Sequence, residues 1–207
     1  VVLNADEGSF DLMVAHRLEP EIYIFRSLAF FSKAVERVGE ESYPIHIKLD
    51  TGMHRLGFME GELDMLTETL GETPSVKVAT IFSHLNCSDM PQEDRYTREQ
   101  IARFDRMSGR LAAALPYPVL RHTANSAAIE RFPEAQFDMC RLGLGLYGFG
   151  FEHNDELKPV STLKSRIVQL KHLSAGEAVG YGRAGKLTRD SVTATVPMGY
   201  ALSLIHI

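Results

Sequence analysis

The sequence has few cysteines, no tryptophan, no long apolar run and no excess of positive charge. Two cysteines among 207 residues do not make the disulfide framework of a small secreted domain, so we expect a reducing, cytoplasmic setting. With 22 Lys and Arg against 27 Asp and Glu, the net charge of -5 gives no electrostatic reason to expect nucleic acid or a membrane surface as a partner. No apolar run approaches the roughly 20 residues of a membrane-spanning helix, and no secretory signal opens the chain.

The length and the two ends of the chain bear on its organisation. A chain of 207 residues, 44% of them hydrophobic, can bury a full core as one large domain or slightly more. Residues 1–4 resemble the end of a buried strand without a preceding cap, so we expect the chain to begin inside a domain. The last six residues, 202–207, match the translation of a common DNA-library adapter, and we interpret them as a non-native tail.

Apolar runs rich in β-branched residues alternate with amphipathic stretches, an order typical of parallel strands joined by crossover helices. In the clearest helical stretch, 97–115, apolar residues recur every three or four positions, and Thr97 followed by Gln100 predicts a capping box at its start. The fold class is therefore α/β, either a doubly wound sheet or a barrel. The expected strands are 22–25, 45–49, 76–82, 119–122 and 142–147, and the other expected helices are 27–38 and 61–70.

The pattern changes after Tyr147. A loop with Gly, Asn, Asp and Pro is followed by short strand candidates with no helix between them, which indicates an all-β second domain. We expect an α/β domain over residues 1–150 and the start of a β domain over residues 160–201. The strands expected in this second domain are 164–173, 176–182 and 191–197.

Polar side chains follow the expected strands of the first domain. Lys48, His84 and Arg141 each lie at or just beyond a strand end, and Asn125 and Ser126 follow another. Because the carboxyl ends of parallel strands meet on one rim, we expect these residues to converge on a site. Asn125 and Ser126 also open a helical run, so they either cap that helix or help to bind a phosphate at its first turn.

Two local motifs carry no function in our interpretation. Residues 143–148 match G-x-G-x-x-G, but an acidic, Pro-containing loop follows where a dinucleotide site needs a helix. His84, Cys87 and Asp89 lie close together in the sequence, but no second pair of ligands supports a metal site, so no metal is expected.

Four segments in order resemble alanine racemase. They read KLDTGMHRLGF at 48–58, HTANSAA at 122–128, DMCRLGLGLYG at 138–148 and GEAVGYG at 176–182. The resemblance implies part of a (β/α)8 TIM-type barrel followed by a truncated all-β domain, in a pyridoxal 5'-phosphate enzyme that works as a homodimer. It also implies racemisation of L- and D-alanine, which supplies D-alanine for peptidoglycan. The opening segments resemble racemase domains fused behind a muropeptide ligase.

The resemblance assigns the proton-transferring groups. One base is the lysine that binds the cofactor covalently, in a motif that lies before Val1. The other base corresponds to Tyr181, which in the family reaches into the site of the partner subunit. A tyrosine has a pKa near 10, so it needs a neighbour to become a useful base, and His84 matches the residue that contacts it. Arg141 matches the arginine that faces the cofactor ring nitrogen and leaves it unprotonated.

The resemblance also assigns cofactor and substrate contacts. Ser126, Gly143 and Leu144 match phosphate-binding positions, and Asn125 lies beside them. Arg55 matches the arginine near the substrate carboxylate.

Lys48 matches a lysine that is carbamylated in some members of the family. As ordinary structural alternatives, Lys48 and Arg55 are rim ion-pair residues and Tyr181 is a β-domain core residue.

Without the covalent lysine, we expect the chain itself to be inactive, whatever the complete protein does. Two other functions remain open at this point. One is a racemase of broad amino-acid specificity, and the other is a non-catalytic pyridoxal-phosphate-binding protein of cofactor homeostasis. The latter class lacks a second domain, which the strand candidates after residue 160 disfavour.

Overall fold

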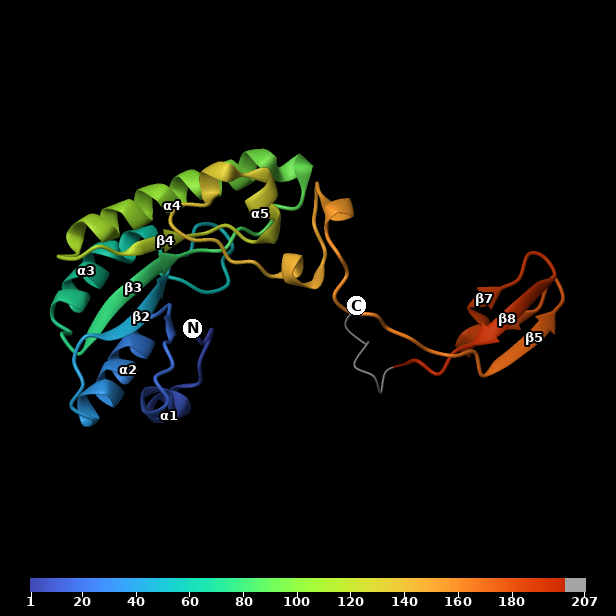
Figure 1. The fold of residues 1–207 in the computed structure, drawn as a ribbon, viewed down its shortest axis with the longest axis horizontal. Coiled ribbons are helices and arrows are strands. Elements are labelled where there is room, and N and C mark those ends of the chain that lie inside the picture. The colour runs from blue at the N-terminus through green and yellow to red at the C-terminus, as the bar shows by residue number, and fades with distance from the viewer. Residues whose placement is uncertain (200–207) are drawn as a thin grey trace. The chain divides into compact units, whose positions relative to one another are not determined.

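A computed structural model gives the fold and describes residues 1–199 (Figure 1). The chain divides into two compact units, Val1–Val160 and a second unit from Ser161 onward. Residues 202–207, which we interpret as a non-native tail, lie outside the described residues, as do the last residues of the expected β domain. Among the described residues, no helix combines the length and apolar character that crossing a membrane requires.

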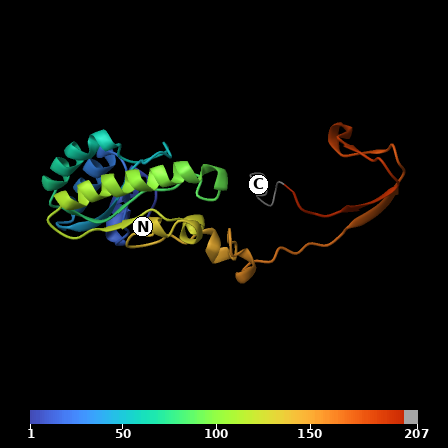
Figure 2. The ribbon, with the colours of Figure 1, turned by 90° about the horizontal axis from the view of Figure 1, so that it is seen from above.

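The first unit contains a parallel sheet with crossover helices, as the strand and helix alternation predicts. The four strands lie in the order β1-β2-β3-β4. Figure 2 gives a second view of the long helix along the sheet. The strands are β1 (Glu21–Ile22), β2 (Tyr43–Lys48), β3 (Val76–Phe82) and β4 (Leu120–His122). The helices are α1 (Phe10–Ala15), α2 (Phe25–Arg37), α3 (Leu63–Gly71), α4 (Asp94–Ala114) and α5 (Ser126–Arg131). Short 3-10 helices cover η1 (Glu7–Ser9), η2 (Glu60–Glu62), η3 (Pro91–Glu93), η4 (Pro133–Ala135), η5 (Leu144–Tyr147) and η6 (Asn154–Glu156).

One hydrophobic core joins the sheet to its helices. Ile45 and Ile47 of β2 are fully buried and belong to the same cluster as Phe31 of α2, Leu66 of α3 and Phe104 of α4. Strands that are covered by helices bury apolar side chains in this way, and the burial is the main stabilising term. The core therefore holds the carboxyl ends of the strands in fixed positions.

Helix α4 confirms the predicted helix but not its predicted start. Phe104, Met107 and Leu111 are fully buried, as their spacing predicts. The helix begins at Asp94, directly after η3, so the predicted capping box at Thr97 is wrong and Thr97 is a buried residue inside the helix. The physical reason is that an acidic residue in the first turn already complements the helix dipole.

The strand predicted at 142–147 is also wrong, because this segment forms a loop and the 3-10 helix η5. Leu144 and Leu146 are 57% and 61% exposed, so they do not form a core strand. Gly148 ends the turn with φ 85°, and a Cβ there would lie 2.3 Å from the carbonyl oxygen of Lys158. Glycines at this density favour a tight turn over an extended strand.

A β-bulge lies between β2 and β3. Ile45 pairs with Val78 but His46 pairs with Thr80, so Ala79 is an extra residue in β3. A bulge changes the face to which the following side chains point. Val78 therefore belongs to the helix-covered core, whereas Thr80 lies on the opposite face of the sheet and contacts His46.

The described part of the second unit, residues 161–199, contains strands and turns but no α-helix, as predicted. Strands β5 (Gln169–Leu173) and β8 (Ser191–Thr195) pair antiparallel, and β6 (Ala178–Val179) pairs with β7 (Gly185–Lys186). Of the strand predicted at 176–182, only the middle forms a strand, β6. The prediction fails beyond it because Gly180 and Gly182 have positive φ and the 3-10 helix η7 (Tyr181–Arg183) follows.

Candidate functional site

A cavity of about 550 Å³ lies in the first unit, where β2, β3 and β4 end. In parallel α/β folds this is the rim on which ligand sites are built. The structure brings eight of the nine predicted site residues to its lining. They are Lys48, Arg55, His84, Asn125, Ser126, Arg141, Gly143 and Leu144.

Arg141 is held by acceptors from the ends of two strands. Its Nη1 donates to Nδ1 of His122 at 2.6 Å, and its Nη2 donates to the carbonyl oxygen of Ser83 at 2.6 Å and of Thr123 at 3.3 Å. Among the described residues, no hydrogen bond engages its Nε, which is the donor left for a ligand. Burial lowers the pKa of Arg141 to about 10, so the side chain stays charged at neutral pH.

His84 lies beside this guanidinium. Burial, followed by the positive charges of Arg141, Arg55 and Lys48, lowers the pKa of His84 to about 4. The imidazole is therefore neutral at pH 7. Because Arg141 has no acceptor, Nδ1 of His84 accepts from its Nη2 at 3.2 Å, and the remaining proton lies on Nε2. His84 thus keeps one N–H for a ligand.

Ser126 and two glycines form a small polar cradle. The Ser126 hydroxyl oxygen accepts from the backbone N–H of Gly143 at 2.9 Å and of Gly145 at 3.3 Å. A Cβ at either glycine would lie 3.7 or 3.8 Å from this oxygen and would fill the space beside it. Successive backbone N–H groups around a hydroxyl are a common way to bind phosphate oxygens.

Asn125 caps helix α5, so this structural alternative is confirmed. Its side-chain oxygen accepts from the N–H of Ala128 at 3.0 Å and from the hydroxyl of Ser88 at 2.8 Å. Its amide donates to the carbonyl oxygen of Leu85 at 3.3 Å. With its side chain engaged in this way, Asn125 fixes the orientation of the loop that presents Ser126.

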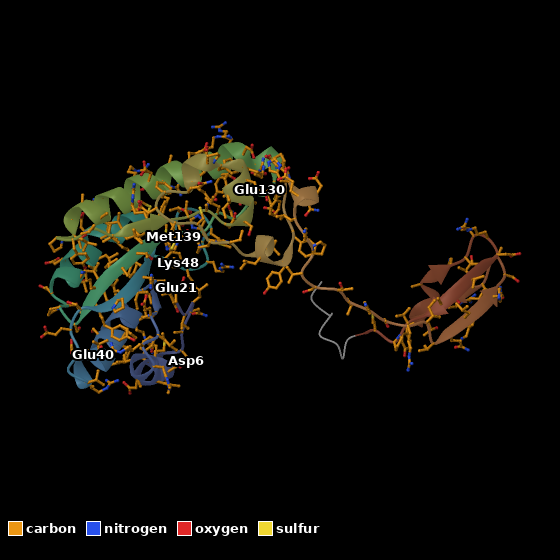
Figure 3. The ribbon with its side chains drawn as sticks, viewed as in Figure 1. Asp6, Glu21, Glu40, Lys48, Glu130 and Met139 are labelled. Atoms are coloured by element: carbon orange, nitrogen blue, oxygen red, sulfur yellow. The ribbon has the colours of Figure 1, made fainter. Side chains whose placement is uncertain are left out.

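Lys48 forms an ion pair, as its structural alternative predicts, but the pair is buried and its partner, Glu21, was not predicted. Its Nζ lies 2.8 Å from Oε1 of Glu21, and the two side chains are 8% and 1% exposed (Figure 3). The other oxygen of Glu21 accepts from the N–H of Asn4 at 2.7 Å, and the ammonium lies 5.7 Å from the centre of the Phe82 ring. An acidic residue inside an apolar strand was the available signal. Carbamylation of Lys48 stays a prediction.

Arg55 lies on a loop that Asp50 holds in place. The Asp50 carboxylate accepts from the N–H of Gly52 at 2.9 Å and of His54 at 3.0 Å. Gly57 has φ 133°, and a Cβ there would lie 2.5 Å from the backbone nitrogen of Asp50, so only glycine fits. The loop therefore carries the exposed guanidinium of Arg55 at the cavity rim.

Tyr181 is the predicted site residue that the cavity does not contain. It lies in η7 of the second unit with its side chain fully exposed. Its role as a base stays a prediction. Within residues 1–199, no three His, Cys, Asp or Glu side chains gather to form a metal site, and His84 with Cys87 and Asp89 is no exception.

The first unit has a parallel sheet with helices packed on one face and a cavity where the strands end. These features place it in the class of (β/α)-barrel proteins, and the unit forms part of such a barrel. A family model described as "Alanine racemase, N-terminal domain" matches residues 1–150, and one described as "Alanine racemase, C-terminal domain" matches residues 160–204. The chain belongs to the alanine racemase family.

Individual relatives agree with this assignment. The chain is 35% identical over 194 residues to the alanine racemase of Sorangium cellulosum, which covers 93% of this chain and 51% of that protein. It is 34% identical over 198 residues to the alanine racemase of Clostridium novyi, covering 92% of this chain and 50% of that protein. The chain thus spans about half the length of the curated relatives it matches.

Solved structures show the same likeness. The alanine racemase of D-cycloserine-producing Streptomyces lavendulae has a TM-score of 0.83 at 27% identity, over 96% of this chain and 54% of that one. The alanine racemase of Bartonella henselae, solved with covalently bound pyridoxal phosphate, has a TM-score of 0.74 at 25% identity, over 97% of this chain and 55% of that one.

Proposed function

We propose that the complete protein carrying these 207 residues interconverts L- and D-alanine with pyridoxal 5'-phosphate, as a cytoplasmic homodimer that supplies D-alanine for peptidoglycan. The observation that carries this proposal is the convergence of Arg141, His84 and the Ser126 cradle on one cavity in a member of the alanine racemase family. The match of residues 160–204 to the C-terminal domain model favours a racemase over a single-domain cofactor-binding protein.

The residues present fit the cofactor. The Ser126 hydroxyl, whose oxygen accepts from the N–H groups of Gly143 and Gly145, keeps its own hydrogen to donate to a phosphate group, and Leu144 lies between the two glycines in the cavity lining. The free Nε–H of Arg141 is suited to a ring nitrogen acceptor. When bound, pyridoxal phosphate delocalises the negative charge that remains after the α-proton leaves. The relative from Bartonella henselae, which holds this cofactor, supports the fit.

Arg141 has the protonation state that racemisation needs. With a pKa of about 10, its guanidinium keeps its proton at neutral pH, so it would donate a hydrogen bond to a ring nitrogen without transferring the proton. By leaving a ring nitrogen unprotonated, Arg141 would limit the charge drawn into the cofactor and would disfavour transamination as a side reaction.

In this proposal, two bases on opposite faces of the substrate exchange the α-proton. One is Tyr181 of the partner subunit, which has the exposure that this needs. The N–H of His84 would donate to the tyrosine oxygen and favour its ionised form. The other is a lysine for which we assign no counterpart among the 207 residues, so we propose that the chain by itself is inactive.

Arg55 supplies the charge that binds the substrate. A guanidinium at the cavity rim is suited to the α-carboxylate of alanine, because it donates two parallel hydrogen bonds to a carboxylate. Lys48 lines the same cavity, with its charge paired to Glu21. Both cations also keep His84 neutral, since their charge opposes its protonation.

The test uses the complete protein loaded with pyridoxal phosphate. We expect it to convert L-alanine to D-alanine and to incorporate deuterium at Cα in D₂O, measured by chiral chromatography and mass spectrometry. Tyr181→Phe should abolish conversion in both directions while cofactor absorbance is retained. A loaded protein that forms no D-alanine would refute the proposed reaction, and normal turnover of the Tyr181→Phe variant would refute the two-base assignment.

A further inference from the structure

We propose that Thr80, His46 and Glu19 are positioning residues for Arg141, which they reach through His122 by an unbroken chain of hydrogen bonds across the sheet. The proposal rests on the proposed function, because it concerns the guanidinium that would face the cofactor. None of the three positions lines the cavity. Their effect would therefore be transmitted through hydrogen bonds and not by contact with a ligand.

The chain of contacts joins three adjacent strands. Nη1 of Arg141 lies 2.6 Å from Nδ1 of His122, and Nε2 of His122 lies 3.0 Å from the hydroxyl oxygen of Thr80. The same hydroxyl lies 2.8 Å from Nδ1 of His46, whose Nε2 lies 2.6 Å from Oε2 of Glu19. The path runs from the ligand cavity to a partly exposed carboxylate.

The two ends of the chain fix the direction of every hydrogen bond. Arg141 only donates, so Nδ1 of His122 accepts, and a neutral His122 must carry its proton on Nε2. That N–H donates to Thr80, whose own hydrogen then donates to Nδ1 of His46. His46 carries its proton on Nε2 and donates it to the carboxylate of Glu19, which only accepts. Each of the four hydrogen bonds therefore has one donor and one acceptor.

Burial makes this arrangement unique. His46, Thr80 and His122 are 5%, 5% and 4% exposed, so a broken link would leave a polar group without water or partner. Burial, and then the charge of Arg141, lowers the pKa of His122 to about 3, and burial lowers the pKa of His46. The Phe82 ring stacks on His122 with centroids 5.1 Å apart and holds its plane.

The consequence for Arg141 is a fixed guanidinium plane. His122 offers a single lone pair at Nδ1, and the orientation of its ring sets where Nη1 lies. With Nη2 held by backbone carbonyl groups, the plane of the guanidinium is fixed, and with it the direction of Nε–H.

The first measurement is the tautomer of both histidines, by ¹⁵N NMR of the complete protein labelled at histidine and recorded without alanine. We expect neutral rings protonated at Nε2 for both His46 and His122 at pH 7. Thr80→Val should shift the His122 signals, and Thr80→Ser should restore them. Thr69→Val, which removes an exposed hydroxyl on α3, is the matched control and should change neither histidine.

The second measurement is steady-state kinetics of the same variants. Thr80→Val should lower kcat by on the order of tenfold with little change in KM for alanine, and Thr80→Ser should recover kcat. If Thr80→Val does not fold, Glu19→Ala tests the same chain from its 39% exposed end, and the His122 signals should again shift. A wild-type His122 protonated at Nδ1, or His122 signals unchanged in both variants, would overturn the proposal. Absent racemisation with the expected tautomers would instead refute only the proposed function.

Discussion

The buried pair of Lys48 and Glu21 gives a prediction about stability in which the magnitude follows from burial. At 2.8 Å and an effective dielectric constant of about 20, two unit charges attract each other by roughly 6 kcal/mol before desolvation is counted. Glu21→Gln leaves the Lys48 ammonium buried without its counter-charge. We expect a loss of about 3–5 kcal/mol in the free energy of unfolding, because an unpaired buried charge costs that much.

The chain offers a matched control at its surface. Glu7 and Arg26 lie 2.9 Å apart, nearly the same distance, but their side chains are 36% and 69% exposed. Glu7→Gln should therefore cost only about 0–1 kcal/mol, because water screens this pair. The contrast between the two substitutions isolates burial, since both replace a glutamate with the same amide.

The assay is urea-induced unfolding of the complete protein, followed by circular dichroism. The double variant Glu21→Leu with Lys48→Met should recover most of the lost stability, since replacing both partners of a buried pair with apolar residues is often neutral. Equal losses in Glu21→Gln and Glu7→Gln would refute the reasoning. So would a double variant that is less stable than Glu21→Gln alone.

Three further predictions concern the loops and the buried histidines. Ser126→Ala should weaken pyridoxal phosphate binding by about tenfold in an absorbance titration, while the Asn125 cap keeps α5 intact; unchanged affinity would contradict the cradle. Gly57→Ala should lower the free energy of unfolding by more than about 1 kcal/mol, because Gly57 has a positive φ and its Cβ would clash with the backbone. Gly61→Ala should not lower it, because the space around Gly61 is open. His122, with its pKa lowered from 6.5 to about 3, is protonated in the unfolded chain before the folded one. Stability should therefore fall as pH drops from 6.5 toward 3, and His122→Asn should flatten that slope in pH-dependent unfolding.

The sequence predicted most where a local pattern decides the structure. The bounds of β3 agree with the predicted strand at 76–82, and the buried face of α4 agrees with the spacing of its apolar residues. The strand-end rule predicted that five residues would meet at one cavity, because the carboxyl ends of parallel strands share a rim, and they do. The other three predicted residues of the lining, Arg55, Gly143 and Leu144, came from the resemblance to the family. These features depend on periodicity and topology, which a single sequence carries.

What the sequence could not predict depends on contacts between distant segments. The partner of Lys48 is Glu21, 27 positions earlier. An acidic residue inside an apolar strand signals a buried charge, but it does not identify the residue that pairs with it. The apolar residues of segment 142–147 predict a strand, but the segment forms a loop and a 3-10 helix, and Gly148 ends that turn with a positive φ. Tyr181 remains a prediction of the resemblance, since its role depends on a second subunit.

The extra residue in β3 has a consequence for how this protein tolerates changes of length. Because Val78 and Thr80 already oppose consecutive residues of β2, removing Ala79 would restore an uninterrupted ladder and leave both neighbours opposite the same partners. A one-residue deletion inside a central strand ordinarily shifts the register and prevents folding. At Ala79 we expect the protein still to fold. A deletion at Ile81 instead would turn Thr80 and Phe82 into adjacent residues on opposite faces and separate the hydroxyl from the ring stacked on His122.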